Sequence, residues 1–507
     1  MTKKRSRSNC ILLLLIVGIL LSACQPQPAS VFLAMPEAQQ EIQVAESTTP
    51  AQNPLITPLP TRPPYAPGVL VDYIAQPGDT LPLLANRFNT SIEEILAANP
   101  IIPENATTMP PGMPMEIPIY YIPLWGSPYQ ILPDSLFING PSQMDFDTSE
   151  FVDSQPGWFK DYIGFAAGAN RSGAEIVDVV AQNFSVSPQL LLALLEYHAG
   201  ALSQTTPHDG ADIYTLGLED WRHKGPYLQL VLAANTLNHG FYGYRTGRIQ
   251  TIEHHDGTIE RPDPWQNAAS VAFQYYFSHF YPTEAYAYSV SAEGFANTYR
   301  SLFGDPWVSV EPHIPGSLVQ PEFILPFEPG AIWALTGGPH TGWGTGYPWA
   351  ALDFAPPSVV GGCVSSDEWA TAVAPGVVVR SETGVVALDL DEDGDERTGW
   401  VMFYLHIGTK GRAPIGAKLL TGEHIGHPSC EGGRSTGTHI HIARKYNGEW
   451  IPAEGTLAFN FEGWIAHNGE EPYLGTLTRH SRTVTACLCS NMYSHIQSDV
   501  LPNPTEE

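Results

Sequence analysis

The spacing of apolar residues changes twice along the chain, and each spacing predicts a different kind of structure. Residues 69–120 carry two short runs with helical spacing, enclosed by two strand-like runs. Residues 145–312 carry long amphipathic runs punctuated by Gly, Pro and Ser, which predicts a helical domain. Residues 322–498 carry short runs of Val, Ile, Tyr and Phe between turn signals, which predicts an antiparallel β domain. We therefore expect a multidomain α+β protein.

The first of these modules has the pattern strand, helix, helix, strand. The run "LPLLANRF" at residues 81–88 places its apolar positions at helical spacing. Ser91, with Glu94 three residues later, predicts a capping box at the start of the second helix. After that helix the chain returns in a strand that ends near Ile117. The module is therefore a small βααβ unit.

The first 68 residues are expected to lie outside the folded domains. Residues 1–24 join a basic start to a short apolar run, which is typical of an export signal rather than a membrane span. The end of that run, "LSAC", resembles the bacterial lipobox, which implies that Cys24 is lipidated and tethers the chain to a membrane. An ordinary signal peptide with an incidental cysteine is the alternative. Residues 25–68 are rich in Pro, Gln, Thr and Ala and predict a disordered linker.

Charge restricts the partners. The chain has 507 residues, and its 52 acidic and 24 basic side chains give a formal net charge of −28. This charge argues against nucleic acid or anionic lipid as a partner, because both are themselves anionic.

Residues 69–120 contain the patterns "YxAxxGDTL", "AANP" and "GMPMEIP", and with them the segment resembles a LysM domain over its full length. LysM domains bind polymers of N-acetylglucosamine, in peptidoglycan or chitin, so the resemblance implies a glycan as partner. A small helical hairpin without sugar binding is the alternative. The resemblance places the sugar groove on two loops, with the candidate residues Gly78, Asp79, Thr80, Leu81, Asn99 and Ile101.

The middle domain, residues 145–312, contains a helix that is expected to start at Ser187, with a proline in its first turn. Its run "SPQLLLALLEYHAG" resembles the helix that carries the catalytic acid in lysozyme-like transglycosylases. The position that the family gives to that acid is His198 in this chain. Glu196 lies two positions earlier, about 200° around the helix, and so on the opposite face. We expect a degenerate lysozyme-like scaffold, with glycan cleavage as the alternative.

Five residues of the β domain have side chains suited to a metal centre. "GGPHTGWGTGYPWAALDFAPP" contains His340 and Asp353, and "FYLHIG" contains His406. "STGTHIHIARKYNG" contains His439 and His441, which share one face of a strand because side chains alternate with period two. Hydrolysis at zinc needs three protein ligands, a position for water, and groups that move protons. Unrelated polar residues in Gly-rich loops are the alternative.

Together these segments resemble the β-lytic branch of the lysostaphin-type metallopeptidases, which cut peptide bonds in bacterial cell walls. The more familiar branch has its first histidine four residues before the aspartate, where this chain has Trp349. The β-lytic branch instead has a long loop there, and this chain fits it. The resemblance implies Zn²⁺ held by His340, Asp353 and His441, with His439 as general base and His406 as the group that stabilises the oxyanion.

Four cysteines follow the first 24 residues, and four in an exported chain predict one or two disulfides. Sequence alone leaves their connectivity open. We favour Cys363 with Cys430, because both flank the candidate metal loops. Cys487 and Cys489 have no second cysteine pair to form a metal site, which favours a disulfide role for them as well.

An acidic segment, "DLDEDGDERTGW", follows the spacing of a calcium loop at positions 1, 3, 5 and 7, with glycine at position 6. Position 12 is Trp400 rather than glutamate, so no EF-hand closes. An ordinary acidic hairpin turn is the alternative. The candidate Ca²⁺ ligands are Asp389, Asp391, Asp393 and Asp395.

These features lead us to expect an extracytoplasmic, lipid-anchored protein of the cell envelope. Its C-terminal domain would hydrolyse peptide bonds of peptidoglycan, and its LysM module would hold the enzyme on the wall, which raises the effective substrate concentration. Two alternatives remain open: a catalytically inactive peptidoglycan-binding protein, and a wall enzyme whose helical domain also cuts glycan.

Overall fold

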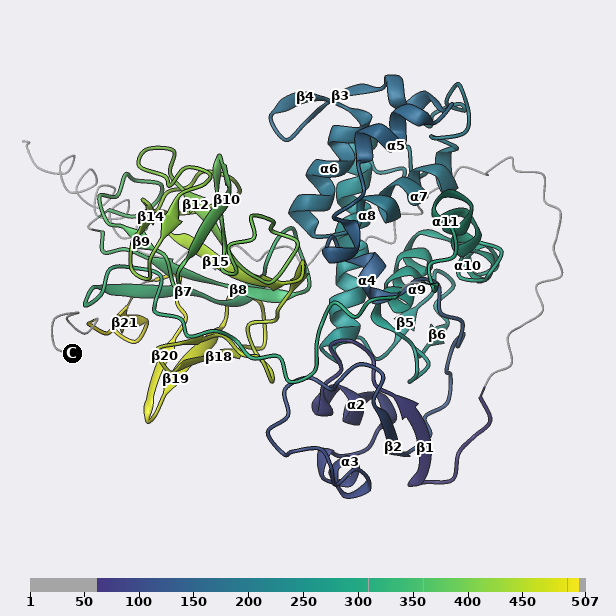
Figure 1. The fold of residues 1–507 in the computed structure, drawn as a ribbon, viewed down its shortest axis with the longest axis horizontal. Helices are drawn as coiled ribbons and strands as arrows, with labels where there is room; N and C mark the ends of the chain where they lie inside the picture. The colour runs from purple at the N-terminus through teal and green to yellow at the C-terminus, as the bar shows by residue number, and fades with distance from the viewer. Residues whose placement is uncertain (1–61, 309, 359, 490, 501–507) are drawn as a thin grey trace, which may run out of the picture. The chain divides into compact units, whose positions relative to one another are not determined.

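The computed structural model describes residues 62–500 except residues 309, 359 and 490. The expected export signal, Cys24 and residues 25–61 of the linker lie outside this part of the chain. Figure 1 shows the chain passing from a small N-terminal module with β1 and β2, through a set of helices, to a C-terminal part built mainly of strands. Among the residues described, every helix is too short or too polar to span a bilayer.

The N-terminal module folds as its pattern predicts, with β1 (Val69–Ile74), α2 (Leu81–Phe88), α3 (Ile92–Ala98) and β2 (Pro114–Ile119). The two strands pair in antiparallel fashion. Ser91 caps α3 by accepting a hydrogen bond from the backbone N–H of Glu94, but the capping box is only half formed. The Glu94 carboxylate instead accepts hydrogen bonds from the hydroxyl groups of Thr90 and Tyr120.

The middle of the chain is helical. Its helices are α4 (Asp134–Phe137), α5 (Thr148–Ser154), α6 (Gly173–Phe184), α7 (Pro188–Ala199), α8 (Pro226–Arg245), α9 (Ala268–Phe280), α10 (Thr283–Ser289) and α11 (Phe295–Phe303), with the 3-10 turns η1 (Pro141–Gln143) and η2 (Trp158–Asp161) and the hairpins β3 (Ile163–Ala166)–β4 (Ala169–Ser172) and β5 (Ile252–Glu253)–β6 (Ile259–Glu260). Ser187 caps α7, as expected, by accepting from the N–H of Leu190.

The residues at the end of α7 are engaged within the domain. The Glu196 carboxylate accepts hydrogen bonds from the backbone of Leu202 and Ser203, and so caps the turn that follows the helix. His198 is hydrogen-bonded to the hydroxyl groups of Tyr276 and Tyr281, and burial lowers its pKa to about 3. A neutral, half-buried histidine therefore occupies the position of the transglycosylase acid. The degenerate scaffold stays a prediction, with glycan cleavage as its alternative.

The β domain is built on an antiparallel sheet in the order β13-β10-β11-β12-β15-β8-β7-β21, with β16 paired to β15. Its strands are β7 (Ile332–Thr341), β8 (Trp349–Ala355), β10 (Gly376–Glu382), β11 (Gly384–Asp389), β12 (Trp400–Ile407), β13 (Lys418–Leu419), β15 (Ile440–Tyr446), β16 (Glu449–Trp450) and β21 (His495–Gln497). Smaller sheets join β9 (Ala370–Thr371) to β14 (His424–Gly426), and β17 (Asn460–Phe461), β18 (Trp464–Asn468), β19 (Gly475–Arg479) and β20 (Arg482–Thr485) in sequence order.

The two faces of the central sheet bury different cores. Leu352 and Ile442, which pair across β8 and β15, belong to the core of the β domain itself. Ala351 and Ala443, the next pair, point the other way and belong to the core that also contains the helices of the middle domain. One side of the sheet is therefore partly covered by the helical domain.

Candidate metal centre

Three neighbouring strands bring the expected zinc ligands together. His340 lies on β7, Asp353 on β8 and His441 on β15, and these strands are adjacent in the order β15-β8-β7. Asp353 pairs directly with His441, while His340 pairs with Ala351, two residues from the aspartate on the same face. One ligand atom from each of the three residues lies within 4.8 Å of the other two. The sheet register thus gathers residues that are up to about a hundred positions apart.

Backbone carbonyl groups fix which ring nitrogen of each ligand histidine faces the centre. His340 donates from Nδ1 to the carbonyl of Gly338 at 2.8 Å, and His441 donates from Nε2 to the carbonyl of Gly342 at 3.1 Å. The remaining nitrogens, His340 Nε2 and His441 Nδ1, are 3.0 Å apart. In neutral rings with these tautomers, that contact joins two lone pairs rather than a donor and an acceptor. Such an arrangement is repulsive unless a cation lies between the nitrogens, so it fits a metal ion.

Asp353 completes the donor set. Its buried Oδ1 has no hydrogen-bond partner among the described residues and lies 3.2 Å from His340 Nε2 and 3.4 Å from His441 Nδ1. Burial works to raise the pKa of Asp353, but its interactions with His340 and His439 more than offset this and hold it well below its ordinary value. Two imidazole nitrogens and one carboxylate oxygen are a set that zinc takes, with a fourth position left for water.

His439 borders the metal centre from the same strand as His441, two residues earlier. Its Nε2 lies 3.7 Å from Asp353 Oδ1, and its Nδ1 donates to the carbonyl of Gly437 at 2.8 Å. Because Nδ1–H is committed to that carbonyl, Nε2 is the nitrogen that faces the metal centre and is able to accept a proton there. This geometry suits a general base.

His406 comes from the end of β12, where the backbone takes a positive φ of 65° next to an irregularity in the pairing of β11 with β12. Its ring lies 4.5 Å from that of His439, centroid to centroid, and its Nδ1 donates to the carbonyl of Glu431 at 2.8 Å. Burial, with smaller effects of His439 and His441, lowers the pKa of His406 to about 4, so the ring is neutral at neutral pH. Its Nε2 is then an acceptor.

Sequence reasoning did not single out two residues that build the centre. Gly337 has no room for a side chain, because a Cβ there would come within 2.5 Å of Asp353 Oδ2. Tyr473, from the turn between β18 and β19, stacks on His340 with 4.1 Å between ring centroids, and burial raises its pKa to about 12. The "GG" before His340 was a visible signal for a close approach, whereas nothing in the sequence connects Tyr473 to β7.

A disulfide holds two loops next to His439. Cys363 and Cys430 are bonded, with an S–S distance of 2.05 Å, which is the pairing that we favoured from sequence. The same two loops are joined by hydrogen bonds from the N–H of Thr438 to the carbonyl of Gly362 and from the N–H of Val364 to Thr438 Oγ1. Cys487 and Cys489 form a second disulfide.

The residues expected to bind glycan are placed differently from one another. Asp79 is fully buried, where its carboxylate accepts from the Tyr73 hydroxyl and pairs with Arg87. Gly78 lies against the guanidinium of Arg245, which also donates to the carbonyl of Pro77. These two loop residues therefore hold the module together and attach it to the helical domain.

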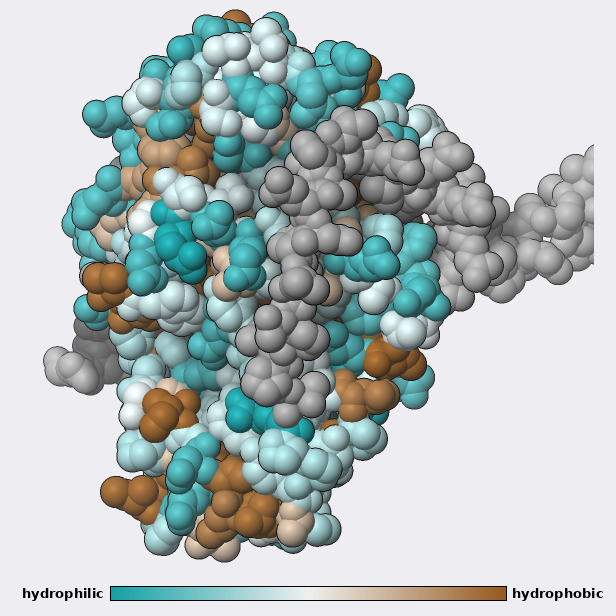
Figure 2. All heavy atoms as spheres, turned by 90° about the vertical axis from the view of Figure 1, so that its right-hand side faces the viewer, coloured by the Kyte–Doolittle hydropathy of each residue, from teal (hydrophilic) through white to brown (hydrophobic). Residues whose placement is uncertain are grey.

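The other four expected residues also differ in their exposure and in their contacts. Thr80 caps α2, Leu81 and Asn99 are buried, and Ile101 is 86% exposed. Val69, Leu70 and Ile74 of the same module are also exposed, and Figure 2 shows apolar residues among the hydrophilic ones on the face in view. Sugar binding at the expected groove thus stays a prediction that depends on Ile101 and on backbone groups.

The acidic loop between β11 and β12 brings only part of the expected calcium set together. Carboxylate oxygens of Asp389, Asp391 and Asp393 lie within 4.8 Å of one another. Asp395 is instead paired with Arg397 at 2.6 Å. Asp389 accepts hydrogen bonds from the N–H groups of Asp391 and Gly394, as an acidic hairpin turn does without an ion. Nothing in the structure supports Ca²⁺ over that simpler role.

Comparisons with known proteins found two family models and several relatives that match this chain. A family model described as "LasA, N-terminal domain" matches residues 130–316, and a LysM domain model matches residues 73–118. Protease LasA of Pseudomonas aeruginosa is 24% identical over 341 residues, which cover 64% of this chain and 75% of that protein. The beta-lytic metalloendopeptidase of Lysobacter enzymogenes is 29% identical over 144 residues, which cover 28% of this chain and 76% of that protein.

The chain is a LysM-containing relative of the lysostaphin-type metalloendopeptidases. A solved structure titled "A Novel M23 Metalloprotease Pseudoalterin from Deep-sea" aligns with 33% of this chain and 96% of its own length, at 24% identity and a TM-score of 0.29. The match to the LasA N-terminal domain model, residues 130–316, includes the helical region predicted at residues 145–312, and the lysozyme-like scaffold stays a prediction.

Proposed function

We propose that this protein is a zinc metalloendopeptidase of the cell envelope that hydrolyses peptide bonds in the stems or cross-bridges of peptidoglycan. The observation that carries the proposal is the meeting of His340, Asp353 and His441, with His406 and His439 beside them. Relatives that are metalloendopeptidases, and a LysM module in the same chain, support the choice of substrate.

The side chains of His340, Asp353 and His441 would hold the metal. The other two histidines would take part in proton transfer. Zinc held there would supply Lewis acidity, which would polarise the scissile carbonyl and lower the pKa of a water molecule to about 7. His439 accepts the proton of the attacking water at Nε2, because its Nδ1 is held by Gly437. His406 would stabilise the oxyanion through a proton at its Nε2, because its Nδ1–H is already committed to Glu431, and His439, whose ring centre is 4.5 Å away, would pass on the proton that it takes from the water.

The rest of the chain would bring this centre to the wall. The LysM module is proposed to bind peptidoglycan or another N-acetylglucosamine polymer, and lipidation of Cys24 would keep the protein extracytoplasmic on a membrane without spanning it. A module held on the polymer raises the local concentration of peptide substrate at the linked metal centre.

Mass spectrometry of fragments released from purified peptidoglycan tests the proposal. We expect new amino groups within the peptide stems or bridges, absent after chelation and restored by zinc. The masses also identify the bond. Failure to release peptide with zinc bound would contradict the proposal and leave a wall-binding protein, and sugar release under chelation would point to the helical domain instead.

A further inference from the structure

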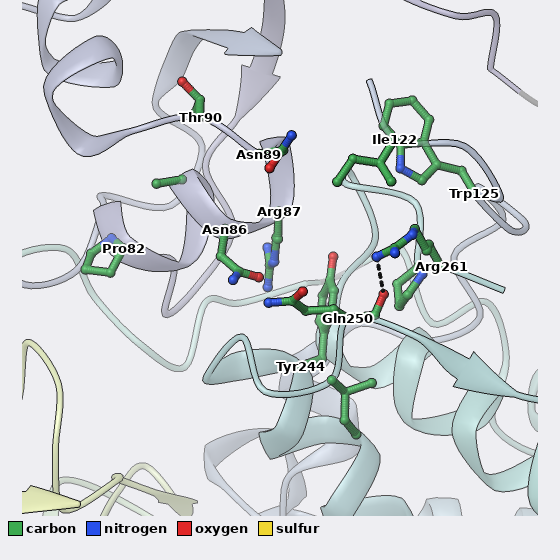
Figure 3. A pocket seen from close by; sticks show the side chains of 13 residues that line it. Pro82, Asn86, Arg87, Asn89, Thr90, Ile122, Trp125, Tyr244, Gln250 and Arg261 are labelled. Atoms are coloured by element: carbon green, nitrogen blue, oxygen red, sulfur yellow. Dashed lines mark hydrogen bonds between the residues drawn. The ribbon is translucent and has the colours of Figure 1, made fainter. Parts of the chain in front are cut away.

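A pocket of about 390 Å³ lies between the LysM module and the helical domain (Figure 3). Its walls come from α2 and the residues just after it, from residues 122 and 125 of the connection that follows β2, and from the end of α8 with the segment beyond it. None of its lining residues belongs to the β domain, and none is among the six expected LysM glycan residues. The pocket is therefore separate from both sites described above.

Rigid contacts between the two domains hold the walls of this pocket in place. The ring of Phe88 packs edge-on against Trp265 at 5.0 Å, and Trp265 Nε1 donates to the carbonyl of Asp72 at 3.0 Å. The guanidinium of Arg87 lies 4.1 Å from the ring centre of Tyr244 and is paired with Asp79. The pocket is thus part of a packed junction rather than a gap between loosely tethered domains.

The polar side chains of the pocket are suited to a sugar. Asn86, Asn89 and Gln250 are exposed amides, each able to donate and accept hydrogen bonds, and they line one pocket with the half-buried ring of Trp125. In Figure 3 the side chains of Asn86 and Gln250 point toward one another, and Trp125 lies with Arg261 across from them. An indole beside several amides offers an apolar surface for sugar C–H groups and partners for hydroxyl and N-acetyl groups.

The charge of the pocket restricts the kind of sugar. Its lining contains two arginines and no acidic residue, although the whole chain has a net charge of −28. Arg87 is already neutralised by Asp79, but no carboxylate of the described residues lies within ion-pair distance of Arg261. Within residues 62–500, as far as they are described, the one polar contact of the Arg261 guanidinium is a long hydrogen bond of 3.4 Å to the carbonyl of Gln250. Arg261 therefore has donors left for a carboxylate.

We propose that this pocket is a second carbohydrate site, which takes an acidic saccharide unit with its carboxylate on Arg261 and its ring beside Trp125. The amides of Asn86, Asn89 and Gln250 bind its hydroxyl or N-acetyl groups. The volume is at the lower end of the range of small-molecule pockets, so it accommodates one or two sugar rings. The site does not depend on the metal centre, and it would let the chain distinguish acidic from neutral glycans.

Isothermal titration calorimetry of the full chain tests this site, with a hyaluronan hexasaccharide as probe and chitohexaose as its neutral counterpart. The first carries both carboxylates and N-acetyl groups, whereas the second carries only N-acetyl groups. Chelator is present throughout, so the readout is separate from the proposed peptidase activity. The variants are Arg261→Gln, Asn86→Ala and, as a control with the same charge change on an exposed side chain of α11, Arg300→Gln.

We expect the acidic hexasaccharide to bind, Arg261→Gln to weaken this binding about tenfold or more, and Asn86→Ala to weaken it less. Arg300→Gln should leave it unchanged, and Arg261→Gln should leave any binding of chitohexaose unchanged. The proposal is overturned if the acidic hexasaccharide does not bind, if Arg261→Gln has no effect on it, or if Arg300→Gln weakens it equally.

Discussion

Gly337 lies where β7 approaches the carboxylate of Asp353, and its lack of a side chain matters as much as the ligands themselves. An added Cβ would meet Asp353 Oδ2 at 2.5 Å, well inside ordinary contact distance. Gly338 is restricted in the same way by the carbonyl of Leu474. These two glycines allow the turn that carries Tyr473 and the strand that carries Asp353 to lie against the same short stretch of β7.

The variant Gly337→Ala should therefore displace Asp353 and weaken metal binding by about tenfold to a hundredfold, as loss of a supporting contact does at metal sites. The measurement is zinc content after dialysis against a graded series of chelator concentrations. Gly361→Ala is the matched control, because a Cβ at Gly361 meets no atom within 4 Å. Equal zinc retention in the two variants would show that the close approach has no functional consequence.

For single residues, the sequence pointed to the candidate ligands but not to every side chain that packs against them. His340, Asp353 and His441 were predictable because their spacing matches a known branch of metallopeptidases. The ring of Tyr473 against His340 was not, since it comes from a turn of a separate small sheet with no periodic signal. Likewise, Asp79 was expected to face a sugar, but its buried carboxylate forms an ion pair with Arg87 and so stabilises the fold.

At the scale of elements, local signals predicted helices well and sheet details less well. The run at residues 173–184 forms α6, because Ser172 and Glu175 close a capping box at its start. The long run that becomes α8 starts at Pro226, where proline in the first turn fixes the beginning. Strand order and the bulge at His406 depend on contacts between distant segments, which no local pattern encodes.

The disulfide Cys363–Cys430 links two loops of the β domain across a sequence separation of 67 residues. In a chain-entropy account a loop of that size stabilises the fold by roughly 4 kcal/mol. Replacing both cysteines with serine should lower the free energy of unfolding by about 2–4 kcal/mol and lower the affinity for zinc, because the loop beside His439 is released. Urea denaturation with metal titration measures both effects.

The second disulfide provides the control for this prediction. Cys487 and Cys489 are only two residues apart, so their removal changes little chain entropy and should have a much smaller effect. Similar losses of stability from the two double variants would contradict the role assigned to Cys363–Cys430.

At the scale of the whole molecule, one buried ion cluster joins the three folded parts. Arg245 of α8 contacts Glu449 of the β domain at 3.1 Å, Asp134 of α4 at 3.3 Å and the carbonyl of Pro77 in the LysM module. His313, in the segment that leads to the β domain, adds a 2.6 Å contact to Glu449. Together with the shared core on the sheet, this cluster makes the folded parts depend on one another.

The cluster predicts a dependence of stability on pH. Burial works to raise the pKa of Glu449, but Arg245 and His313 more than offset this and hold it below its ordinary value of 4.5. Glu449 therefore stabilises the fold above about pH 4.5, and the contribution is lost as pH falls through the lowered pKa. The contribution of Asp134 to stability changes with pH in the opposite direction: burial raises its pKa, so this contribution decreases as pH rises.

Glu449→Gln should therefore lower stability at pH 7 by about 3 kcal/mol, the cost of removing one of the two carboxylates that face the buried Arg245, and should flatten the decline of stability below pH 4.5. Urea denaturation at pH 7 and at pH 4 measures both quantities. Glu104→Gln, on an exposed side chain, is the control and should behave as the unmodified chain. An unaltered acid dependence in Glu449→Gln would exclude this carboxylate as the responsible group.

Measurements of zinc content and cleavage on the same samples test whether the histidine-lined centre hydrolyses peptide bonds. The unmodified chain and His439→Ala are each loaded with zinc, assayed for bound metal, and incubated with peptidoglycan while new amino groups are counted. We predict one zinc per chain in both, and amine release reduced at least a hundredfold in His439→Ala, because the ligands remain while the proton acceptor is lost. A zinc-loaded, unmodified chain that releases no amine, or a His439→Ala variant that cleaves as well as the unmodified chain, would contradict the account.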